Sequence, residues 1–272
     1  MDDRATLVDG EFEDKVPASD RGFLFGDHVF ETMLWSGRSV PLWDLHWQRL
    51  SHGCEQLGFH APREALLLAD IERLMGGEDA SKPSVLRMTV TRGSSATGYW
   101  VPDDLKPRRI LQRRDFGRSI RQHRADGVRL ATAAITLPSM GFGLGLKHGN
   151  RLFQVMCAKE CARRGVDEVL VYRDNGHLAE AMASNVIVVK SGLLMTPDCP
   201  DVSGVGLRWV ESLELGLKSC PLARSDVDDA DEVLLINSVS GPRPVVELDG
   251  RSLTAGLAYE SLQRHWQGVC AS

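Results

Sequence analysis

One lysine of this chain stands out because of the residues around it. Lys147 lies in the segment 141–151, which reads GFGLGLKHGNR and is followed by a predicted helix. Glycine lets a backbone approach a bound group closely, because it carries no side chain. A lysine held in such a segment can be partly desolvated, which lowers its pKa and makes the neutral amine nucleophilic. The segment therefore predicts a lysine nucleophile, with a surface lysine in a flexible turn as the alternative.

Two further charged residues are candidates for binding a ligand. Glu180 lies in the segment 177–185, which reads HLAEAMASN, so its carboxylate stands beside a predicted strand of small and apolar residues. The alternative for Glu180 is an exposed charge on an edge strand. Arg49 lies in a predicted helix, where its guanidinium could bind a phosphate through two parallel hydrogen bonds. The alternative for Arg49 is an ordinary arginine on a helix face.

Two short segments have the composition of phosphate sites. The segment 203–206, which reads SGVG, precedes a predicted helix, so its backbone amides would point outward at the positive end of that helix. Asn237 and Ser238 end an apolar strand and offer an amide and a hydroxyl. The alternative for both is structural, since a glycine before a helix is often only a cap.

The elements that must position these residues are short and follow each other irregularly. Such an order is typical of an α+β protein rather than of regular strand–helix alternation. Residues 19–27, with their glycines, read as a loop, and the helix over 150–164 offers an apolar stripe of Leu152, Val155, Met156 and Cys161. Periodicity and turn residues predict strands over 5–9, 11–16, 29–35, 84–92, 109–114, 128–137, 168–172, 177–181, 185–190, 193–196, 232–237 and 245–248, and helices over 42–57, 61–75, 150–164, 207–217 and 255–266.

A charged segment with few apolar residues, 117–127, marks a predicted domain boundary. We therefore expect an N-terminal α/β domain over 1–115 and a C-terminal α/β domain over 116–272. A basic cluster runs into this segment, and its simplest interpretation is a solvated linker or strand edge. The alternative is that it attracts an anionic substrate. The cluster consists of Arg108, Arg109, Arg113, Arg114, Arg118, Arg121 and Arg124.

Composition excludes several classes of protein. A hydrophobic content of 43% predicts a real core, and a net charge of −5 argues against a nucleic-acid partner. No apolar run approaches the ~20 residues that a membrane span requires, and the N-terminus carries no secretory segment. The six cysteines are scattered and lack the short ligand spacing of a zinc site. We therefore expect reduced thiols in a cytoplasmic protein without a metal site.

The candidate residues stand in an order that resembles the fold-type IV pyridoxal-phosphate enzymes. This family includes branched-chain and D-amino-acid aminotransferases and 4-amino-4-deoxychorismate lyase. The motifs that carry the resemblance are Ser19–Asp27 (SDRGFLFGD), His46-x-x-Arg49-Leu50, Lys147-His148-x-Asn150-Arg151-Leu152, Glu180-x-x-x-Ser184-Asn185, Thr196-Pro197 and Asn237-Ser238. They span nearly the whole chain, and their joint order is more specific than any one of them.

Within the family the chain looks most like the lyase. The residues after Lys147 resemble the lysine motif of the lyase, and so does Arg92-Gly93-Ser94 followed by Gly98-Tyr99. One departure is Thr97, where the lyase loop often has a basic residue. The resemblance implies an enzyme that eliminates pyruvate and gives 4-aminobenzoate, a folate precursor. The alternative that it leaves open is a D-amino-acid or branched-chain aminotransferase.

The resemblance also implies a cofactor, pyridoxal 5′-phosphate, in the cleft between two α/β domains. By carry-over, Lys147 bonds the cofactor aldehyde and then acts as the base, and Glu180 bonds the pyridine nitrogen. Thr32 is a further catalytic candidate, and Tyr99 and Arg92 are candidates for the substrate pocket. The phosphate contacts are expected from Arg49, Val205, Gly206, Asn237 and Ser238. Relatives are homodimers, so the resemblance implies a homodimer here as well.

Overall fold

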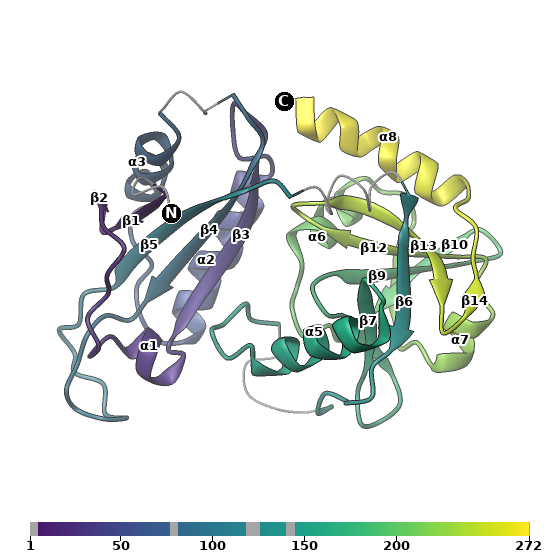
Figure 1. The fold of residues 1–272 in the computed structure, drawn as a ribbon, viewed down its shortest axis with the longest axis horizontal. Coiled ribbons are helices and arrows are strands. Elements are labelled where there is room, and N and C mark those ends of the chain that lie inside the picture. The colour runs from purple at the N-terminus through teal and green to yellow at the C-terminus, as the bar shows by residue number, and fades with distance from the viewer. Residues whose placement is uncertain (1–4, 77–80, 118–125, 140–144, 272) are drawn as a thin grey trace. The chain divides into compact units, whose positions relative to one another are not determined.

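The computed structural model describes residues 5–76, 81–117, 126–139 and 145–271, and the chain forms two compact units (Figure 1). The first unit comprises the residues up to Phe116 together with Lys147–Asn150. The second unit comprises Gly117–Leu146 and Arg151–Ser272. Lys147 is thus grouped with the first unit, although the chain on both sides of its segment belongs to the second.

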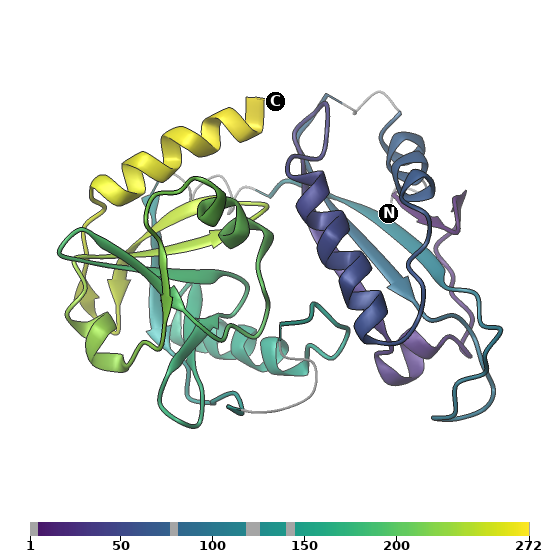
Figure 2. The ribbon, with the colours of Figure 1, turned by 180° about the vertical axis from the view of Figure 1, so that it is seen from behind.

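Within the described ranges the first unit is a sheet with two longer helices on one face (Figure 2). Its elements are β1 (Thr6–Val8), β2 (Glu11–Phe12), α1 (Arg21–Phe25), β3 (His28–Trp35), α2 (Trp43–Gln56), α3 (Glu64–Met75), β4 (Ser84–Thr91) and β5 (Arg108–Asp115). The five strands pair antiparallel in the order β2-β1-β5-β4-β3. Met33 and Leu86 of the sheet pack with Leu50 of α2 and Leu67 of α3 in one buried core.

The pairing of β3 with β4 shows which side chains lie on each face of this sheet. The strands pair without interruption from His28 opposite Thr91 to Trp35 opposite Ser84. Side chains alternate along a strand, so Glu31 and Met33 face the helices whereas Phe30 and Thr32 face the other way.

Residues 19–27, predicted as a loop, contain the short helix α1, so that prediction was wrong. Asp20 caps its first turn by accepting a hydrogen bond of 2.8 Å from the Gly22 N–H. Gly26 ends the helix in the left-handed conformation, with φ of 67°. Five helical residues are too few for a hydrophobic period to show in the sequence.

The basic residues of β5 do not lie at a sheet edge, because β5 pairs with β1 on one side and β4 on the other. The strand-edge interpretation was therefore wrong. Acidic partners explain how the strand carries these charges: Arg108 binds Asp9 and Asp20, and Arg109 binds Asp70 at 2.8 Å. Arg118, Arg121 and Arg124 lie outside the described residues.

The second unit contains, in its described part, a nine-stranded mixed sheet with helices around it. Four predictions differ clearly in extent. The strand expected over 128–137 ends at Thr132, and the helix expected over 207–217 is shorter and begins earlier. The strand expected over 245–248 begins at Gly241, and the helix expected over 255–266 continues to Ala271. The elements are β6 (Val128–Thr132), α5 (Leu152–Arg164), β7 (Glu168–Tyr172), β8 (Leu178–Ala181), β9 (Asn185–Lys190), β10 (Leu193–Pro197), α6 (Val205–Ser212), β11 (Lys218–Cys220), α7 (Arg224–Asp228), β12 (Glu232–Asn237), β13 (Gly241–Leu248), β14 (Arg251–Ser252) and α8 (Leu257–Ala271).

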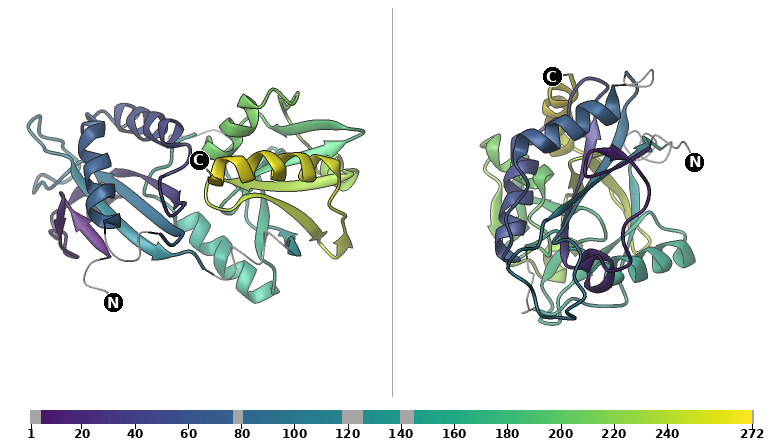
Figure 3. Two further views of the ribbon diagram at one scale, coloured as in Figure 1. Left: turned by 90° about the horizontal axis from the view of Figure 1, so that it is seen from above. Right: turned by 90° about the vertical axis from the view of Figure 1, so that its left-hand side faces the viewer.

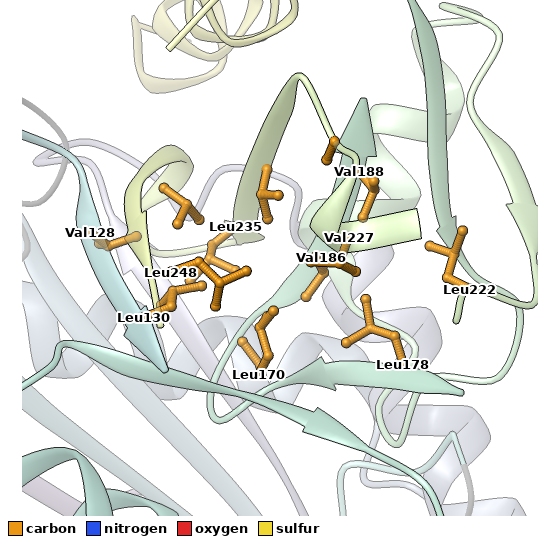
Figure 4. Packing of buried hydrophobic residues seen from close by; sticks show 14 of the residues in the cluster. Val128, Leu130, Leu170, Leu178, Val186, Val188, Leu222, Val227, Leu235 and Leu248 are labelled. Atoms are coloured by element: carbon orange, nitrogen blue, oxygen red, sulfur yellow. The ribbon is translucent and has the colours of Figure 1, made fainter. Parts of the chain in front are cut away.

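The sheet of the second unit curves into a half-barrel. Its strands follow the order β11-β10-β9-β12-β13-β6-β7-β8, with β14 beside β13. β8, at one end of that order, also contacts β9 and β10. Helix α8 lies along β12 and β13 (Figure 3). The concave side is filled by aliphatic side chains (Figure 4), among them Val128, Leu130, Leu170, Leu178, Val186, Val188, Leu222, Val227, Leu235 and Leu248.

Helix α5 buries only Cys161 of the apolar stripe that was predicted. Leu152, Val155 and Met156 are 74%, 50% and 47% exposed, whereas Cys157 and Cys161 are buried. The small cysteine side chains allow α5 to pack closely on β7. All six thiols are free, and burial raises the pKa of Cys157 to about 11. Among the described helices, none combines the length and apolar character needed to cross a membrane.

Candidate active site

Lys147 lies against the strand β3. The Phe30 N–H donates to the Lys147 carbonyl at 2.9 Å, and the Gly149 N–H donates to the His28 carbonyl at 2.9 Å. A Cβ atom at Gly149 would lie 2.2 Å from the His28 ring, so this close pairing requires glycine. The flexible-turn alternative does not fit these bonds, because the backbone on both sides of His148 is paired with β3.

The amine of Lys147 shares one face of the sheet with a hydroxyl and a guanidinium. Its Nζ lies 4.6 Å from the centroid of the Phe30 ring, and Cζ of Arg87 lies 3.8 Å from the same centroid. Thr32 follows Phe30 on the same face of β3 and stands directly opposite Arg87 in β4. The sequence analysis missed Arg87, because a charged residue in an alternating strand looks like an ordinary solvent-facing position.

Arg49 extends from α2 to a carboxylate on β3. Its Nε lies 2.7 Å from Oε1 of Glu31, and its Nη2 lies 2.5 Å from Oε2. His46, one helical turn earlier, places Nδ1 2.6 Å from the same Oε2. Burial by itself raises the pKa of Glu31, but the charge of Arg49 and the hydrogen bonds from Arg49 and His46 outweigh it and hold that pKa at about 2. Arg49, expected at a phosphate, is therefore part of a buried cluster.

The His46 ring has one nitrogen that bonds none of the residues the structure describes. Burial lowers the pKa of His46 more than the charge of Glu31 raises it, so the imidazole is neutral at pH 7. Nδ1 then carries the proton that it shares with Glu31, and Nε2 keeps a lone pair. Nε2 is buried, and no described residue bonds it. A buried polar nitrogen of this kind is usually hydrogen-bonded by water or by a ligand.

Glu180 is a buried carboxylate in the second unit. It lies in β8, which ends the strand order, but its exposed fraction is only 5%, so the alternative of an exposed charge was wrong. Oε2 accepts a hydrogen bond of 3.0 Å from the Val202 N–H. A buried carboxylate of this kind suits a cationic or protonated ligand atom.

The predicted phosphate segments meet at the start of α6. The helix begins at Val205 after Gly204, which has no side chain to cap the first turn. A Cβ at Gly206 would lie 2.9 Å from the Asn237 backbone, so α6 starts directly against the end of β12. Ser238 follows Asn237 and therefore lies near this helix end, which is a favourable place for an anion.

The Asn237 side chain shapes the turn that carries Ser238. Its Oδ1 accepts hydrogen bonds from the N–H groups of Val239 and Ser240, at 3.1 and 2.7 Å. Its Nδ2 donates to Oγ of Ser184 at 3.1 Å. The side-chain amide of Asn237, expected to contact the cofactor, is thus hydrogen-bonded to other residues of the chain.

The two predicted substrate residues lie at the start and middle of one loop. Arg92 donates to both carboxylate oxygens of Asp27, at 2.6 and 3.0 Å, and to the carbonyls of Leu57 and Gly58. A substrate carboxylate would have to displace these partners. Tyr99 is 87% exposed, and its ring packs against Phe25 with centroids 5.2 Å apart.

Comparisons with known proteins show which family this chain resembles. The model of the family "Amino-transferase class IV" matches residues 28–248. A 4-amino-4-deoxychorismate lyase from Pseudomonas aeruginosa is 31% identical with a TM-score of 0.85, covering 97% of this chain and 98% of that one. A putative branched-chain-amino-acid aminotransferase of Methanocaldococcus jannaschii is 28% identical over 260 residues, 90% of this chain and 88% of that protein.

A more distant structure shares the fold alone. It is a hypothetical aminotransferase from Mycobacterium tuberculosis in its PLP-bound form, 20% identical with a TM-score of 0.82 over 95% of this chain and 94% of that one. These matches confirm the resemblance to fold-type IV enzymes and the expected fold class. Since the family model covers most of its length, the chain belongs to the class IV aminotransferase family.

Proposed function

We propose that this chain is a pyridoxal-phosphate-dependent lyase that converts 4-amino-4-deoxychorismate into 4-aminobenzoate and pyruvate. The observation that carries the proposal is the shared sheet face of Lys147, Thr32 and Arg87. An elimination needs a base, a proton donor and an anchor for the substrate carboxylate, and this face offers all three. The 31% identity to the Pseudomonas aeruginosa lyase supports the same choice.

Enzymes of this family use pyridoxal 5′-phosphate, and so does this chain. The residues present fit that cofactor. The buried Glu180 suits a protonated pyridine nitrogen, and the start of α6 beside Ser238, with glycine as its N-cap, suits a phosphate. Lys147 would hold the aldehyde covalently through Nζ. When bound, the cofactor supplies an electron sink for charge on the carbon attached to the substrate nitrogen.

The chain's own residues account for the remaining steps. The free amine of Lys147 takes the proton from the ring carbon that bears the substrate nitrogen. The Thr32 hydroxyl gives a proton to the methylene carbon of the departing enolpyruvyl group, which leaves as pyruvate. Arg87 binds a substrate carboxylate, because its guanidinium can pair with both oxygens at once. Aromatisation of the ring makes the elimination favourable.

The test combines an assay of product with identification of the lysine. We expect the loaded protein to release equal amounts of 4-aminobenzoate and pyruvate from 4-amino-4-deoxychorismate. After borohydride reduction, mass spectrometry should find the pyridoxyl group on Lys147. Thr32→Val should lose most of the release and Thr32→Ser should keep it, because only the serine retains a hydroxyl.

A different outcome would favour an aminotransferase. Transfer of an amino group from D-alanine or leucine to 2-oxoglutarate, without release of 4-aminobenzoate, would refute the lyase and leave the cofactor assignment intact. Absence of an adduct on Lys147 would refute both.

We also propose that the enzyme is a cytoplasmic homodimer, as the resemblance implies. Phe23 and Trp100 of the first unit are exposed by 74% and 78%, and a subunit contact would remove such large apolar side chains from water. Light scattering on the purified protein should give twice the mass of 30.0 kDa, and a mass of one chain would refute the dimer.

A further inference from the structure

Asp201 and Val202, after β10, contact both ends of the segment that carries Lys147. Gly145 forms a parallel bridge with Val202, and the Gly145 N–H donates to the Asp201 carbonyl at 3.0 Å. The Ser203 N–H returns a bond of 3.3 Å to the Gly145 carbonyl. The chain is therefore fixed two residues before Lys147.

An ion pair closes the other end of the same segment. Nη1 of Arg151 lies 2.9 Å from Oδ2 of Asp201, and its Nη2 donates to the Leu146 carbonyl at 2.7 Å. Arg151 thus bonds Leu146, the residue just before Lys147, and so ties the two ends of the segment together. Gln154, one turn into α5, also donates to Oδ2 at 3.4 Å. The side chains of Arg151 and Asp201 are only 17% and 14% exposed, so solvent screens their charges less than those of a surface pair.

The next residues lead to the other groups expected around the cofactor. The Val202 N–H is the donor to Glu180, and its carbonyl accepts from Nδ2 of Asn185 at 3.0 Å. Gly204 is the N-cap of α6, and a Cβ atom at Gly204 would lie 1.7 Å from Oδ1 of Asn185. A movement of Asp201 would therefore be transmitted through Val202 to Glu180 and to the start of α6.

We propose that Asp201 is a positioning residue that fixes the two ends of the Lys147 segment, at Gly145 and Arg151, and that bears through Val202 on the Glu180 carboxylate. Arg151 is its partner on the lysine side, and the Val202 N–H is its link on the carboxylate side. This proposal rests on the cofactor assignment above. Asp201 does not react; it determines how well the amine and the carboxylate hold their places.

The experiment follows the yellow colour of the lysine-bound cofactor as pH is changed. The proton affinity of the nitrogen that Lys147 contributes depends on its solvation and on nearby charge. We expect Asp201→Asn to move the midpoint of this titration by about one pH unit and to weaken cofactor retention about tenfold, which is the effect of one hydrogen bond. Arg151→Lys keeps the positive charge but loses the two N–H groups that bond Asp201 and Leu146. Its titration midpoint and cofactor retention should therefore lie between those of Asp201→Asn and the natural protein.

The matched control is Asp249→Asn in the same unit. Asp249 binds Oγ1 of Thr132 at 2.6 Å and pairs with Arg164 and Arg224, so its loss removes a comparable network. The control should leave the titration midpoint unchanged, even where it lowers the melting temperature. If Asp201→Asn does not fold, Arg151→Lys alone must show the shift.

The results separate this proposal from the cofactor assignment. A natural protein that gains no adduct on Lys147 would overturn the cofactor assignment itself. A natural protein that is loaded, with Asp201→Asn and Asp249→Asn titrating alike, would overturn only the positioning role.

Discussion

Replacing Glu31 by glutamine tests whether the buried cluster on β3 needs its negative charge. The carboxylate is 2% exposed and binds both Arg49 and His46. Glutamine keeps the shape of the side chain but leaves the Arg49 guanidinium buried beside a neutral amide. The structure should respond strongly, because removing one partner of a buried ion pair is costly.

The size of the effect follows from the pKa of Glu31. Lowering that pKa from 4.5 to about 2 corresponds to about 3 kcal/mol between the charged and neutral carboxyl. Removing one partner of a buried ion pair typically costs about 3–5 kcal/mol, so the two values agree. A carboxyl with a lowered pKa stabilises the fold above pH 4.5 and loses this contribution as pH falls toward 2. The difference between the natural protein and Glu31→Gln should therefore shrink on acidification.

The assay is urea unfolding at pH 7 and pH 3, read by hydrogen exchange at the amides of β3 and β4. These amides report on the first unit rather than on the whole chain. The control is Glu11→Gln, since Glu11 pairs with Arg73 in the same unit while 75% exposed. We expect a loss of about 3 kcal/mol for Glu31→Gln and at most about 0.5 kcal/mol for the control. Equal stability of the two variants at pH 7, or a difference that does not shrink at pH 3, would refute this reasoning.

Three further predictions concern other parts of the site. Gly206→Ala places a Cβ 2.9 Å from the Asn237 backbone; equilibrium dialysis should show about tenfold weaker retention of pyridoxal 5′-phosphate, with less effect on pyridoxal, which lacks the phosphate. Arg87→Met should raise KM for the substrate about tenfold or more, the effect of one charged hydrogen bond, and leave the Lys147 adduct unchanged by mass spectrometry. Because burial raises the pKa of Cys157 to about 11, iodoacetamide at pH 8 should label the exposed Cys199 first and Cys157 only after unfolding, as peptide mapping can check.

Local signals in the sequence were enough to find several parts of the candidate site. The glycines around Lys147 indicated a close backbone approach, and the paired backbone at Gly149 shows such an approach to β3. The small and apolar residues around Glu180 made its carboxylate a candidate, with an exposed edge-strand charge as the alternative, and β8 is buried. In both cases the evidence lay within a few residues along the chain, where backbone conformation and strand alternation act.

The partners of the charged residues could not be found in this way. Arg49 and Glu31 are 18 residues apart, and Arg151 and Asp201 are 50 apart, so only the packing of separate elements brings them together. Asp201 follows Pro200 in a segment that reads as an ordinary turn. Nothing in its spacing distinguishes a turn aspartate from one that fixes a reactive lysine.

The placement of Lys147 has an energetic cost that its neighbours must offset. Ordering the backbone of one residue costs about 1–2 kcal/mol, and glycine loses the most freedom of all residues. The segment around Lys147 is rich in glycine, so its sequence alone would leave the amine free to move. The bonds from Phe30 and Gly149 to their carbonyl partners hold the segment along β3, and the Arg151 bond to Leu146 closes its base. Glycine thus permits the close approach, while these bonds supply the order that a reacting amine requires.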